Sequence, residues 1–469
     1  MFQKMLIDGK LVGKDAKGKT IKVINPADAK KFAKVPKGTK KDINKAVAAA
    51  KKAFPAWAAM PLKKRQAIVS KMADVVADNA EMLARLMTKE QGKPLPEAMG
   101  EMAWAEGYLR HYATLQPKGR TIQNDDEFKI EVRRVPLGVV AGICPWNFPV
   151  LVPFWKIGPA LIAGNTIVIK PAPTTPLTIL KILEMCNEFV PAGVINAVTD
   201  ENDLGPVLTN HPDVAKVSFT GSSETGKKIM ESSAGTIKRV TLELGGNDPA
   251  IVLPDVNVKE TAEKIFGGAF LNAGQVCLAV KRVYAHKDIY DEFCDELAKL
   301  AKDTIVDDGL KQGATMGPLQ NEAQFKKVKA LIKSAKKDGE VLSGGVVKGK
   351  KGYFVKPVIV KNVKDGDDIV DKEQFGPVLP VIKFSDIKKV AKQANASDYG
   401  LGGSVWSKNT AKATRIASTI QSGSVWVNQH INIGPHIPMA GFKASGLGVE
   451  QSDEGLEEYT QIQVMNVAK

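Results

Sequence analysis

The sequence predicts an α/β protein with two doubly wound parallel sheets and a small β arm. Its 469 residues are too many for one small core, so we expect two or three structural units. From Val139 onward, short apolar runs alternate with helical patterns, which is typical of buried parallel strands joined by helices. A polar, β-like stretch near residues 118–134 fits neither sheet and predicts an arm that leaves the core.

The first part of the chain is dominated by helical patterns after a short β-like start. Thr39 with Asp42 resembles a helix N-cap and a first-turn acid, ahead of an apolar helical pattern from Ile43 to Ala50. Longer periodic stretches run from about Pro61 to Thr88 and from Pro94 to about Thr114. We expect helices over all three stretches.

The predicted strands form two series, one on each side of Gly246. The first series is Val139–Cys144, Thr166–Ile169, Val194–Val198, Val214–Phe219 and Val240–Leu244. The second is Ala250–Leu253, Val283–His286, Pro357–Val360, Val378–Phe384 and Val425–Asn428. We therefore expect one domain from residues 1–116 and 137–245, and a second domain from residues 246–445.

The end of the chain predicts one further strand. Tyr459–Val467 alternates polar and apolar residues, as a strand with one buried face does. Because no partner lies near it in the sequence, we expect it to pair with the stretch at 118–134, in the same chain or in another subunit. Residues 117–136 and 455–469 would then form the arm.

The composition is that of a globular protein outside membranes. Hydrophobic residues make up 44% and charged residues 25%, and no run approaches the roughly 18 apolar residues of a membrane span. The start of the chain has no long apolar region and no small-residue cleavage site, so we expect a cytoplasmic protein. Of the four cysteines, Cys144, Cys186 and Cys294 are interpreted as small buried hydrophobic residues. The scattered histidines predict no metal site.

The chain is basic, with a formal charge of +15 and a pI near 9.3. Its lysines are spread along helical patterns, and aromatic residues, at 6%, are too few for a base-stacking surface. We therefore expect no nucleic-acid partner. A lysine-rich surface does favour anionic small ligands.

Three side chains point to covalent chemistry on a carbonyl. Cys277 follows Glu243 by 34 positions (277 − 243), and Asn147 lies upstream in Pro145–Pro149. A thiol is the strongest nucleophile among the neutral side chains, and a carboxylate nearby serves it, or a water, as a general base. The amide of Asn147 can donate to a developing oxyanion.

A strand–glycine–helix turn at Phe219–Lys227 suggests phosphate binding. Glycine allows the backbone to approach a phosphate, and the helix N-terminus adds free N–H groups. Gly221 and Gly226 with Lys227 match most of a P-loop, but Lys228 stands where a Ser or Thr is needed. A structural turn is an equal alternative. Lys170 ends a predicted strand, where doubly wound sheets present ligand contacts.

Six motifs then occur in the order in which one family has them: Pro145–Pro149, Lys170-Pro171, Phe219–Ser222, Leu242–Gly246, Gly274–Cys277 and Glu373–Pro377. The chain strongly resembles the NAD(P)+-dependent, hydrolytic aldehyde dehydrogenases over about residues 5–467. The resemblance implies a Rossmann-like cofactor domain, an α/β catalytic domain and a small β arm that assembles subunits. We expect a homotetramer, because the chain ends soon after Val467 without the tail of some dimeric members.

The resemblance also implies roles for individual residues. Cys277 is similar to the nucleophile, Asn147 to the oxyanion donor and Glu243 to the base that activates the deacylating water, which favours hydrolysis over transfer to coenzyme A. Contacts to NAD+ or NADP+ are implied for Trp146, Lys170, Gly221, Ser222, Gly226, Glu373 and Phe375. Glu450 resembles a glutamate sometimes assigned to a proton path; the alternative is a solvated or salt-bridged carboxylate.

The chain departs from the family pattern at Pro173, where many NAD-preferring relatives carry a glutamate. A carboxylate there would repel a 2′-phosphate and proline would not, so we expect NADP+ to be tolerated.

The expected substrate pocket is apolar. It is lined in our interpretation by Phe148, Trp155, Val276, Leu278 and Met439, with Phe154 and Leu271 beside them. The loop from Gln429 to Met439 holds no Arg or Lys to meet a distal carboxylate. We therefore expect medium-chain, terpenoid or aromatic aldehydes. The alternatives are a semialdehyde dehydrogenase and, on the glycine turn alone, a P-loop protein.

Overall fold

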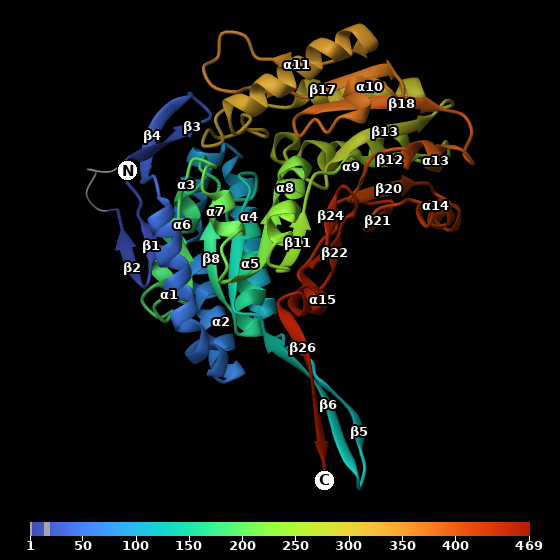
Figure 1. Ribbon diagram of the computed structural model, residues 1–469. Helices are drawn as coiled ribbons and strands as arrows, with labels where there is room; N and C mark the ends of the chain where they lie inside the picture. Colours follow the sequence, from blue (N-terminus) through green and yellow to red (C-terminus); the bar gives the residue numbers. More distant parts are fainter. Residues whose placement is uncertain (1, 14–18) are drawn as a thin grey trace.

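The computed structural model describes residues 2–13 and 19–469 and divides them between two α/β lobes and an arm (Figure 1). One lobe is built mainly from the first half of the chain and the other from the second half. The boundary expected at residues 245/246 falls in the link between the last parallel strand of the first sheet and the first strand of the second. No helix in these two ranges is both long and apolar enough to cross a bilayer.

The first sheet has eight strands in the order β2-β1-β9-β8-β7-β10-β11-β24. Its strands are β1 (Met5–Ile7), β2 (Lys10–Val12), β7 (Val139–Ile143), β8 (Thr166–Lys170), β9 (Ile195–Ala197), β10 (Val214–Thr220), β11 (Arg239–Glu243) and β24 (Gly446–Leu447). The five central strands, β9, β8, β7, β10 and β11, run parallel, and antiparallel pairs lie at both edges of the sheet. All five of these strands were expected from the sequence.

Helices cover both faces of this sheet. They are α1 (Lys40–Ala59), α2 (Leu62–Asp78), α3 (Ala80–Gln91), α4 (Leu95–Tyr112), α5 (Leu151–Ala163), α6 (Leu177–Cys186), α7 (Gly205–Thr209) and α8 (Ser223–Ala234). Alternate residues of β7 enter different cores: Val140 packs with α2 to α6, and Ala141 packs with α1, α7 and α8. Both faces of the central strands are therefore buried, which explains their continuous apolar sequences.

Two helix predictions can be compared with these elements. Thr39 caps α1, and its reciprocal bonds with Asp42 form a capping box, as expected. The periodic stretch from Pro61 to Thr88 is helical, as expected, but it forms two helices, because the chain breaks at Asn79 between α2 and α3.

The second sheet has seven strands in the order β14-β17-β18-β13-β12-β20-β21. They are β12 (Asp248–Val252), β13 (Val280–His286), β14 (Glu340–Val341), β17 (Val358–Val363), β18 (Val378–Phe384), β20 (Gly402–Trp406) and β21 (Ser424–Val427). Every pair is parallel except β14 with β17. Its helices are α9 (Val258–Phe270), α10 (Tyr290–Asp303), α11 (Glu322–Asp338), α12 (Asp368–Asp371), α13 (Val390–Ala394) and α14 (Thr410–Ala417). The sequence analysis missed β20.

The arm is a three-stranded antiparallel sheet that projects from the body of the molecule, with the C-terminus at its end (Figure 1). It contains β5 (Arg120–Asn124), β6 (Phe128–Pro136) and β26 (Thr460–Ala468), and α15 (Ser452–Glu457) leads into it. β26 pairs with β6 from Thr460↔Pro136 to Ala468↔Phe128. The expected pairing therefore forms within one chain.

Short elements complete the fold. They are the hairpin β3 (Thr20–Asn25) with β4 (Lys30–Pro36), the pairs β15 (Gly345–Val346) with β16 (Val355–Lys356), β19 (Tyr399–Gly400) with β23 (Phe442–Lys443), and β22 (Met439–Ala440) with β25 (Val449–Glu450), and the 3₁₀ turn η1 (Leu271–Gly274).

Candidate active site

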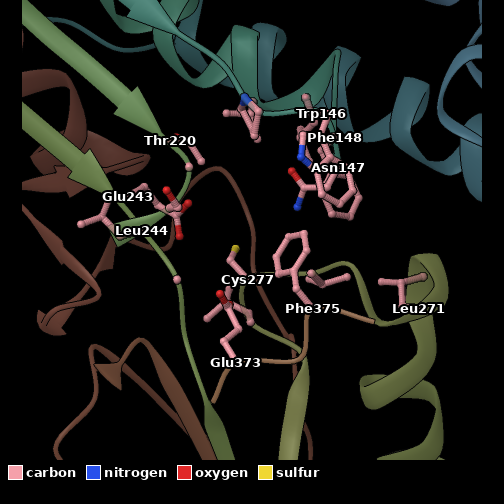
Figure 2. A pocket seen from close by; sticks show the side chains of 18 of the residues that line it. Trp146, Asn147, Phe148, Thr220, Glu243, Leu244, Leu271, Cys277, Glu373 and Phe375 are labelled. Atoms are coloured by element: carbon pink, nitrogen blue, oxygen red, sulfur yellow. The ribbon is translucent and has the colours of Figure 1, made fainter. Parts of the chain in front are cut away.

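Cys277, Glu243 and Asn147 meet at one cavity of about 210 Å³. Glu243 is the last residue of β11, Asn147 lies between β7 and α5, and Cys277 follows η1. Figure 2 shows the three side chains directed towards a common space, with Thr220 and Phe375 at its edges. Residues up to 130 positions apart (277 − 147) thus converge where the two lobes face each other.

The segment that carries Cys277 has an unusual backbone. Asn272, Ala273 and Gly274 have φ values of 50°, 54° and 72°, in the left-handed region. A Cβ on Gly274 would lie 2.4 Å from the carbonyl oxygen of Gly376, so only glycine fits there. Such strain persists only where the surroundings hold it, and it clusters at functional sites.

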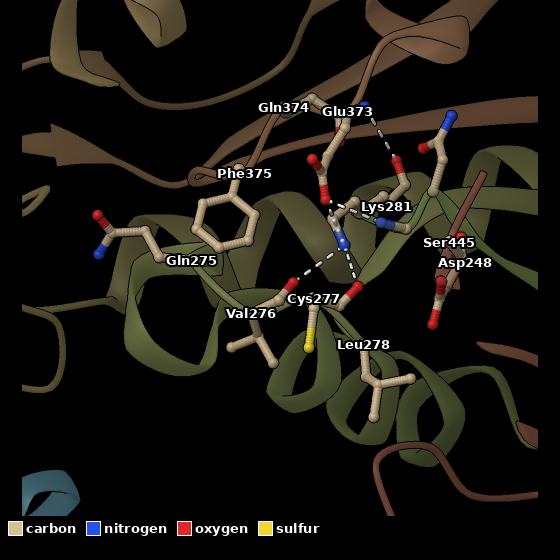
Figure 3. A network of polar contacts seen from close by, with 12 residues as sticks. Asp248, Gln275, Val276, Cys277, Leu278, Lys281, Glu373, Gln374, Phe375 and Ser445 are labelled. Carbon is tan, nitrogen blue, oxygen red and sulfur yellow. Dashed lines mark hydrogen bonds and ion pairs between the residues drawn. The ribbon is translucent and has the colours of Figure 1, made fainter. Parts of the chain in front are cut away.

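The segment around Cys277 lies outside the strands, so its carbonyl groups have no partner strand. Side chains form hydrogen bonds with them instead. Asn147 Nδ2 donates to the carbonyl of Gln275 at 3.0 Å, and His430 Nε2 lies 2.9 Å from that of Leu278. Lys281 Nζ donates to the carbonyls of Val276, at 2.9 Å, and Cys277, at 2.5 Å (Figure 3). Four consecutive carbonyls are therefore fixed around the thiol.

Both the backbone and the side chain of Asn147 are fixed by hydrogen bonds. Its backbone carbonyl accepts from Lys93 Nζ and from Asn272 Nδ2, each at 3.0 Å. One N–H of its side-chain amide donates to the backbone carbonyl of Gln275, and the amide has a second N–H that can donate to a ligand. In the described part of the chain, the backbone N–H of Cys277 donates to no protein acceptor. These two N–H groups form a candidate oxyanion site.

Burial controls the protonation of the thiol and the carboxyl. Burial raises the pKa of Glu243 to about 8, and the hydrogen bond with Cys277 opposes that change. Burial and the carboxylate of Glu243 raise the pKa of Cys277 well above its usual range, and Lys281 lowers it. One carboxyl oxygen of Glu243 is buried without a hydrogen-bond partner. Both groups are therefore largely protonated at pH 7, and the fraction of Glu243 that is ionised is the base that can take the thiol proton.

Glu450 lies behind this site and is 2% exposed. It forms an ion pair with Lys156 at 2.9 Å and accepts a hydrogen bond from Ser218 at 3.0 Å. Lys156 also donates to Thr220, which lines the cavity next to Glu243. The salt-bridged alternative for Glu450 is thus present, and it is part of a polar connection to the cavity.

A groove of about 1030 Å³ adjoins the cavity along the carboxyl ends of the first sheet. The expected cofactor residues Trp146, Lys170, Gly221 and Ser222 line it, together with Pro173. Lys170 is not free, because its ammonium pairs with Asp200 at 2.6 Å. On the other side, Glu373 and Phe375 line the cavity, and the rings of Phe375 and Trp146 meet edge to face with centroids 5.3 Å apart.

The groove fits a dinucleotide. The N-terminus of the 12-residue helix α8 opens onto it, and Ser222 caps that helix through the N–H of Thr225. A Cβ on Gly221 would lie 2.5 Å from the ring of Phe219, so the backbone is bare at this turn. Bare backbone at a helix N-terminus is where a pyrophosphate binds.

Two interpretations of this turn do not fit the structure: the P-loop alternative, which Lys228 already counted against, and the cofactor contact of Gly226. α8 begins at Ser223, so no loop of P-loop length exists and Lys227 lies within the helix. Gly226 does not line the groove: a Cβ there would lie 2.7 Å from the side chain of Leu244, and its N–H already donates to Ser222. Gly226 therefore allows helix–strand packing rather than phosphate contact.

The cavity wall is largely apolar. Phe148, Trp155, Leu271, Val276 and Leu278 line it as expected. Met439 and Phe154 do not, because both are buried in the core behind it. The sequence analysis missed Trp104, Leu151, Val152, Ile431 and Ile433 on the substrate side, and Gln324 and Lys327 near Glu373. Ile431 and Ile433 could have been found, since they belong to the loop from Gln429 to Met439 that was already singled out.

Comparisons with known proteins agree with this geometry. Residues 13–465 match the profile of the aldehyde dehydrogenase family. The chain is 40% identical to phenylacetaldehyde dehydrogenase of Pseudomonas fluorescens over 99% of its own length and 95% of the relative's. Among solved structures, it resembles the NAD+ complex of an aldehyde dehydrogenase from Bacillus cereus (38% identity, TM-score 0.97, covering 100% and 97% of the two chains). An NADP-dependent enzyme of E. coli is similar to the same degree (38%, TM-score 0.96, covering 100% and 98%). The chain therefore belongs to the aldehyde dehydrogenase family and is an oxidoreductase that uses NAD+ or NADP+.

Proposed function

We propose that this protein oxidises apolar aldehydes to carboxylic acids through a covalent adduct on Cys277. The observation that carries the proposal is the convergence of Cys277, Glu243 and Asn147 on one apolar cavity beside a dinucleotide groove. A nucleophile, a base and an oxyanion donor are the groups that acyl chemistry on a carbonyl needs.

In the first stage, the Cys277 sulfur adds to the aldehyde carbon, and its proton passes to Glu243. The oxyanion of the thiohemiacetal would be held by the free Asn147 N–H and the Cys277 N–H, and one such donor contributes about 3–4 kcal/mol. When bound, the nicotinamide cofactor accepts the hydride that leaves the thiohemiacetal carbon, which converts the adduct to a thioester. Glu373 and Phe375 would bind beside the nicotinamide ribose.

In the second stage, Glu243 first gives up the proton that it took from the thiol and then removes a proton from a water that attacks the thioester carbon, and that second proton returns to the Cys277 sulfur as the acid leaves. The carbon–sulfur bond breaks, and the acid and the Cys277 thiol are released. Glu243 lies in the cavity with an unpaired oxygen, which supports water as the acceptor. Lys156 and Glu450 lie behind it and would relay the released proton, the role that the resemblance assigns to Glu450.

The substrate side of the cavity supports an aldehyde with an apolar tail. Its described lining there is aliphatic or aromatic, including Trp104, Leu271, Ile431 and Ile433, without a cation. Among the described residues, the one lysine that lines the cavity is Lys327 of α11, and its charge interacts with that of Glu373 on the cofactor side. A dicarboxylic semialdehyde would leave its distal carboxylate unpaired. The substrate in the printed name of the Pseudomonas relative, phenylacetaldehyde, is of the apolar class.

Turnover of octanal, benzaldehyde, citral and succinic semialdehyde tests this proposal, with NAD+ and with NADP+. We expect the wild type to reduce cofactor with the three apolar aldehydes, and Cys277→Ala to be inactive with all four. Preference for succinic semialdehyde would refute the assignment of an apolar substrate and favour the semialdehyde alternative. Activity of Cys277→Ala would refute the covalent mechanism.

We also propose that the arm assembles a homotetramer as a dimer of dimers. Its side chains Ile122, Phe128, Ile462, Val464 and Val467 are 38–59% exposed, an apolar surface that a second copy would cover. Ile462→Lys with Val464→Lys should dissociate the assembly, which sedimentation velocity measures. An unchanged sedimentation coefficient would contradict the role of the arm.

A further inference from the structure

Lys281 is a buried cation directly behind the proposed nucleophile. It is 2% exposed and belongs to β13, all seven residues of which are buried. Its Nζ carries three N–H groups, two of which donate to the carbonyls of Val276 and Cys277. The third faces Glu373, whose Oε1 lies 3.6 Å away (Figure 3). Every donor of this ammonium is therefore directed at the nucleophile segment or at the proposed ribose ligand.

The carbonyl of Val276 belongs to the same peptide group as the N–H of Cys277. A trans peptide is planar, so a bond that fixes the oxygen also fixes the direction of the N–H on the opposite side. A hydrogen bond accepted at the carbonyl also polarises the peptide and strengthens its N–H as a donor. The ammonium thus acts on the backbone half of the candidate oxyanion site.

Figure 3 places the Cys277 sulfur on the opposite side of the backbone from the Lys281 ammonium. Lys281 therefore cannot contact the sulfur, and its charge acts across one peptide unit. The other titratable groups around the thiol are carboxyls: Glu243 beside it, and Asp248, whose pKa burial raises to about 7. His430, which lies 3.8 Å from Asp248, has a pKa lowered by burial to about 3 and is neutral.

We propose that Lys281 is a positioning residue for the reaction: it orients the Cys277 N–H towards the oxyanion and supplies the positive charge that offsets the carboxylates around the thiol. The proposal rests on the role of Cys277 as the nucleophile. It extends that role to a residue that touches neither substrate nor cofactor.

Three variants separate charge from hydrogen bonding. Lys281→Arg keeps both, Lys281→Gln keeps a donor without the charge, and Lys281→Met removes both. Lys216→Gln is the matched control, since Lys216 is also buried in a parallel strand but donates to Thr241 and lines neither the cavity nor the groove. Circular dichroism and thermal melting show which variants are folded.

The first measurement is the rate at which iodoacetamide alkylates Cys277 without cofactor, followed by mass spectrometry at pH 6–9, below the raised pKa of the thiol, where the rate follows the thiolate fraction. In Lys281→Gln and Lys281→Met this rate should be about tenfold lower at each pH, equivalent to a rise of about one pH unit in the titration midpoint of the thiol. Lys281→Arg and Lys216→Gln should keep the wild-type rate and midpoint. An unchanged rate in folded Lys281→Met would overturn the charge assignment.

The second measurement is the rate of the first turnover with octanal and NAD+. We expect Lys281→Met to lower this rate about 10- to 100-fold with the octanal KM unchanged, because the oxyanion forms only after binding. If the lysine had a purely structural role, its removal would change KM and kcat together, or Lys281→Gln would behave like the wild type in both measurements. Full activity of Cys277→Ala would refute the proposed function, whereas the alkylation profile tests Lys281 independently of turnover.

Discussion

Replacing Glu243 tests both the base and the electrostatics of the site. Burial raises the pKa of this carboxyl to about 8, so only about one tenth of the enzyme carries the ionised base at pH 7. Because the base acts when it is deprotonated, thioester hydrolysis should speed up as pH rises. From this pKa, the rate should increase about fivefold from pH 7 to 8 and less than twofold from pH 8 to 9.

The assay follows the acyl-enzyme directly. Benzaldehyde and NAD+ are mixed with enzyme, the reaction is quenched with acid, and the mass of the acylated Cys277 peptide is followed with time. Glu243→Gln should accumulate this species after one turnover and lose it about 10²- to 10⁴-fold more slowly than the wild type, without the rise through pH 8. Decay that is independent of pH in the wild type, or equally fast in the variant, would refute the role of Glu243.

Glu243→Gln and Lys281→Gln should change the pKa of the Cys277 thiol in opposite directions. The Glu243 carboxylate raises the pKa of Cys277, so removing its charge should lower the midpoint of alkylation. Lys281→Gln should raise that midpoint. If the two substitutions shift it in the same direction, the electrostatic description of the site is wrong.

Three further substitutions probe other parts of the site. Asn147→Ala should slow acylation about 10²- to 10³-fold at unchanged aldehyde KM, measured as the first-turnover rate; a change confined to KM would contradict the oxyanion role. Pro173→Glu should raise the KM for NADP+ about tenfold and spare NAD+, because a carboxylate repels the 2′-phosphate; equal effects on both cofactors would contradict the placement of the ribose. Ile431→Arg should shift the ratio of kcat/KM from octanal towards succinic semialdehyde, unless Ile431 is remote from the aldehyde tail.

Most of the fold could be predicted because parallel strands covered on both faces are continuous apolar runs. β7 and β10 are such strands, and the sequence marks both. β20 was missed because its first residues, Gly402 and Gly403, have no side chain to signal a strand. A Cβ on Gly402 would lie 2.2 Å from a carboxyl oxygen of Asp248, so close packing explains this glycine. The break at Asn79 was missed because the apolar spacing continues through it.

The catalytic side chains could be predicted for a different reason. Glu243 lies at the end of a predicted strand and Asn147 in the loop after one, and doubly wound sheets gather such positions at one edge. Cys277 lies before β13 instead, and its residue type singled it out. Apolar wall residues carry no such signal. Met439 and Phe154 are apolar whether they face the core or the cavity, so the sequence could not distinguish them from Leu271.

The informative signal in the apolar segments is the interruption by a lysine. Burying an ammonium is costly unless it is paired, so a lysine inside an apolar strand or helix predicts a built polar site around it. Lys156 in α5, Lys170 in β8 and Lys281 in β13 are such interruptions, each paired with a carboxyl or held by carbonyls. All three lie beside the cavity or the groove. Lys216 in β10 is a fourth: it donates to Thr241 at 2.6 Å and lies 3.9 Å from a carboxyl oxygen of Glu458, just before β26 of the arm. A lysine in an apolar segment thus identifies a buried polar network, and the position of that network relative to the cavity assigns its function.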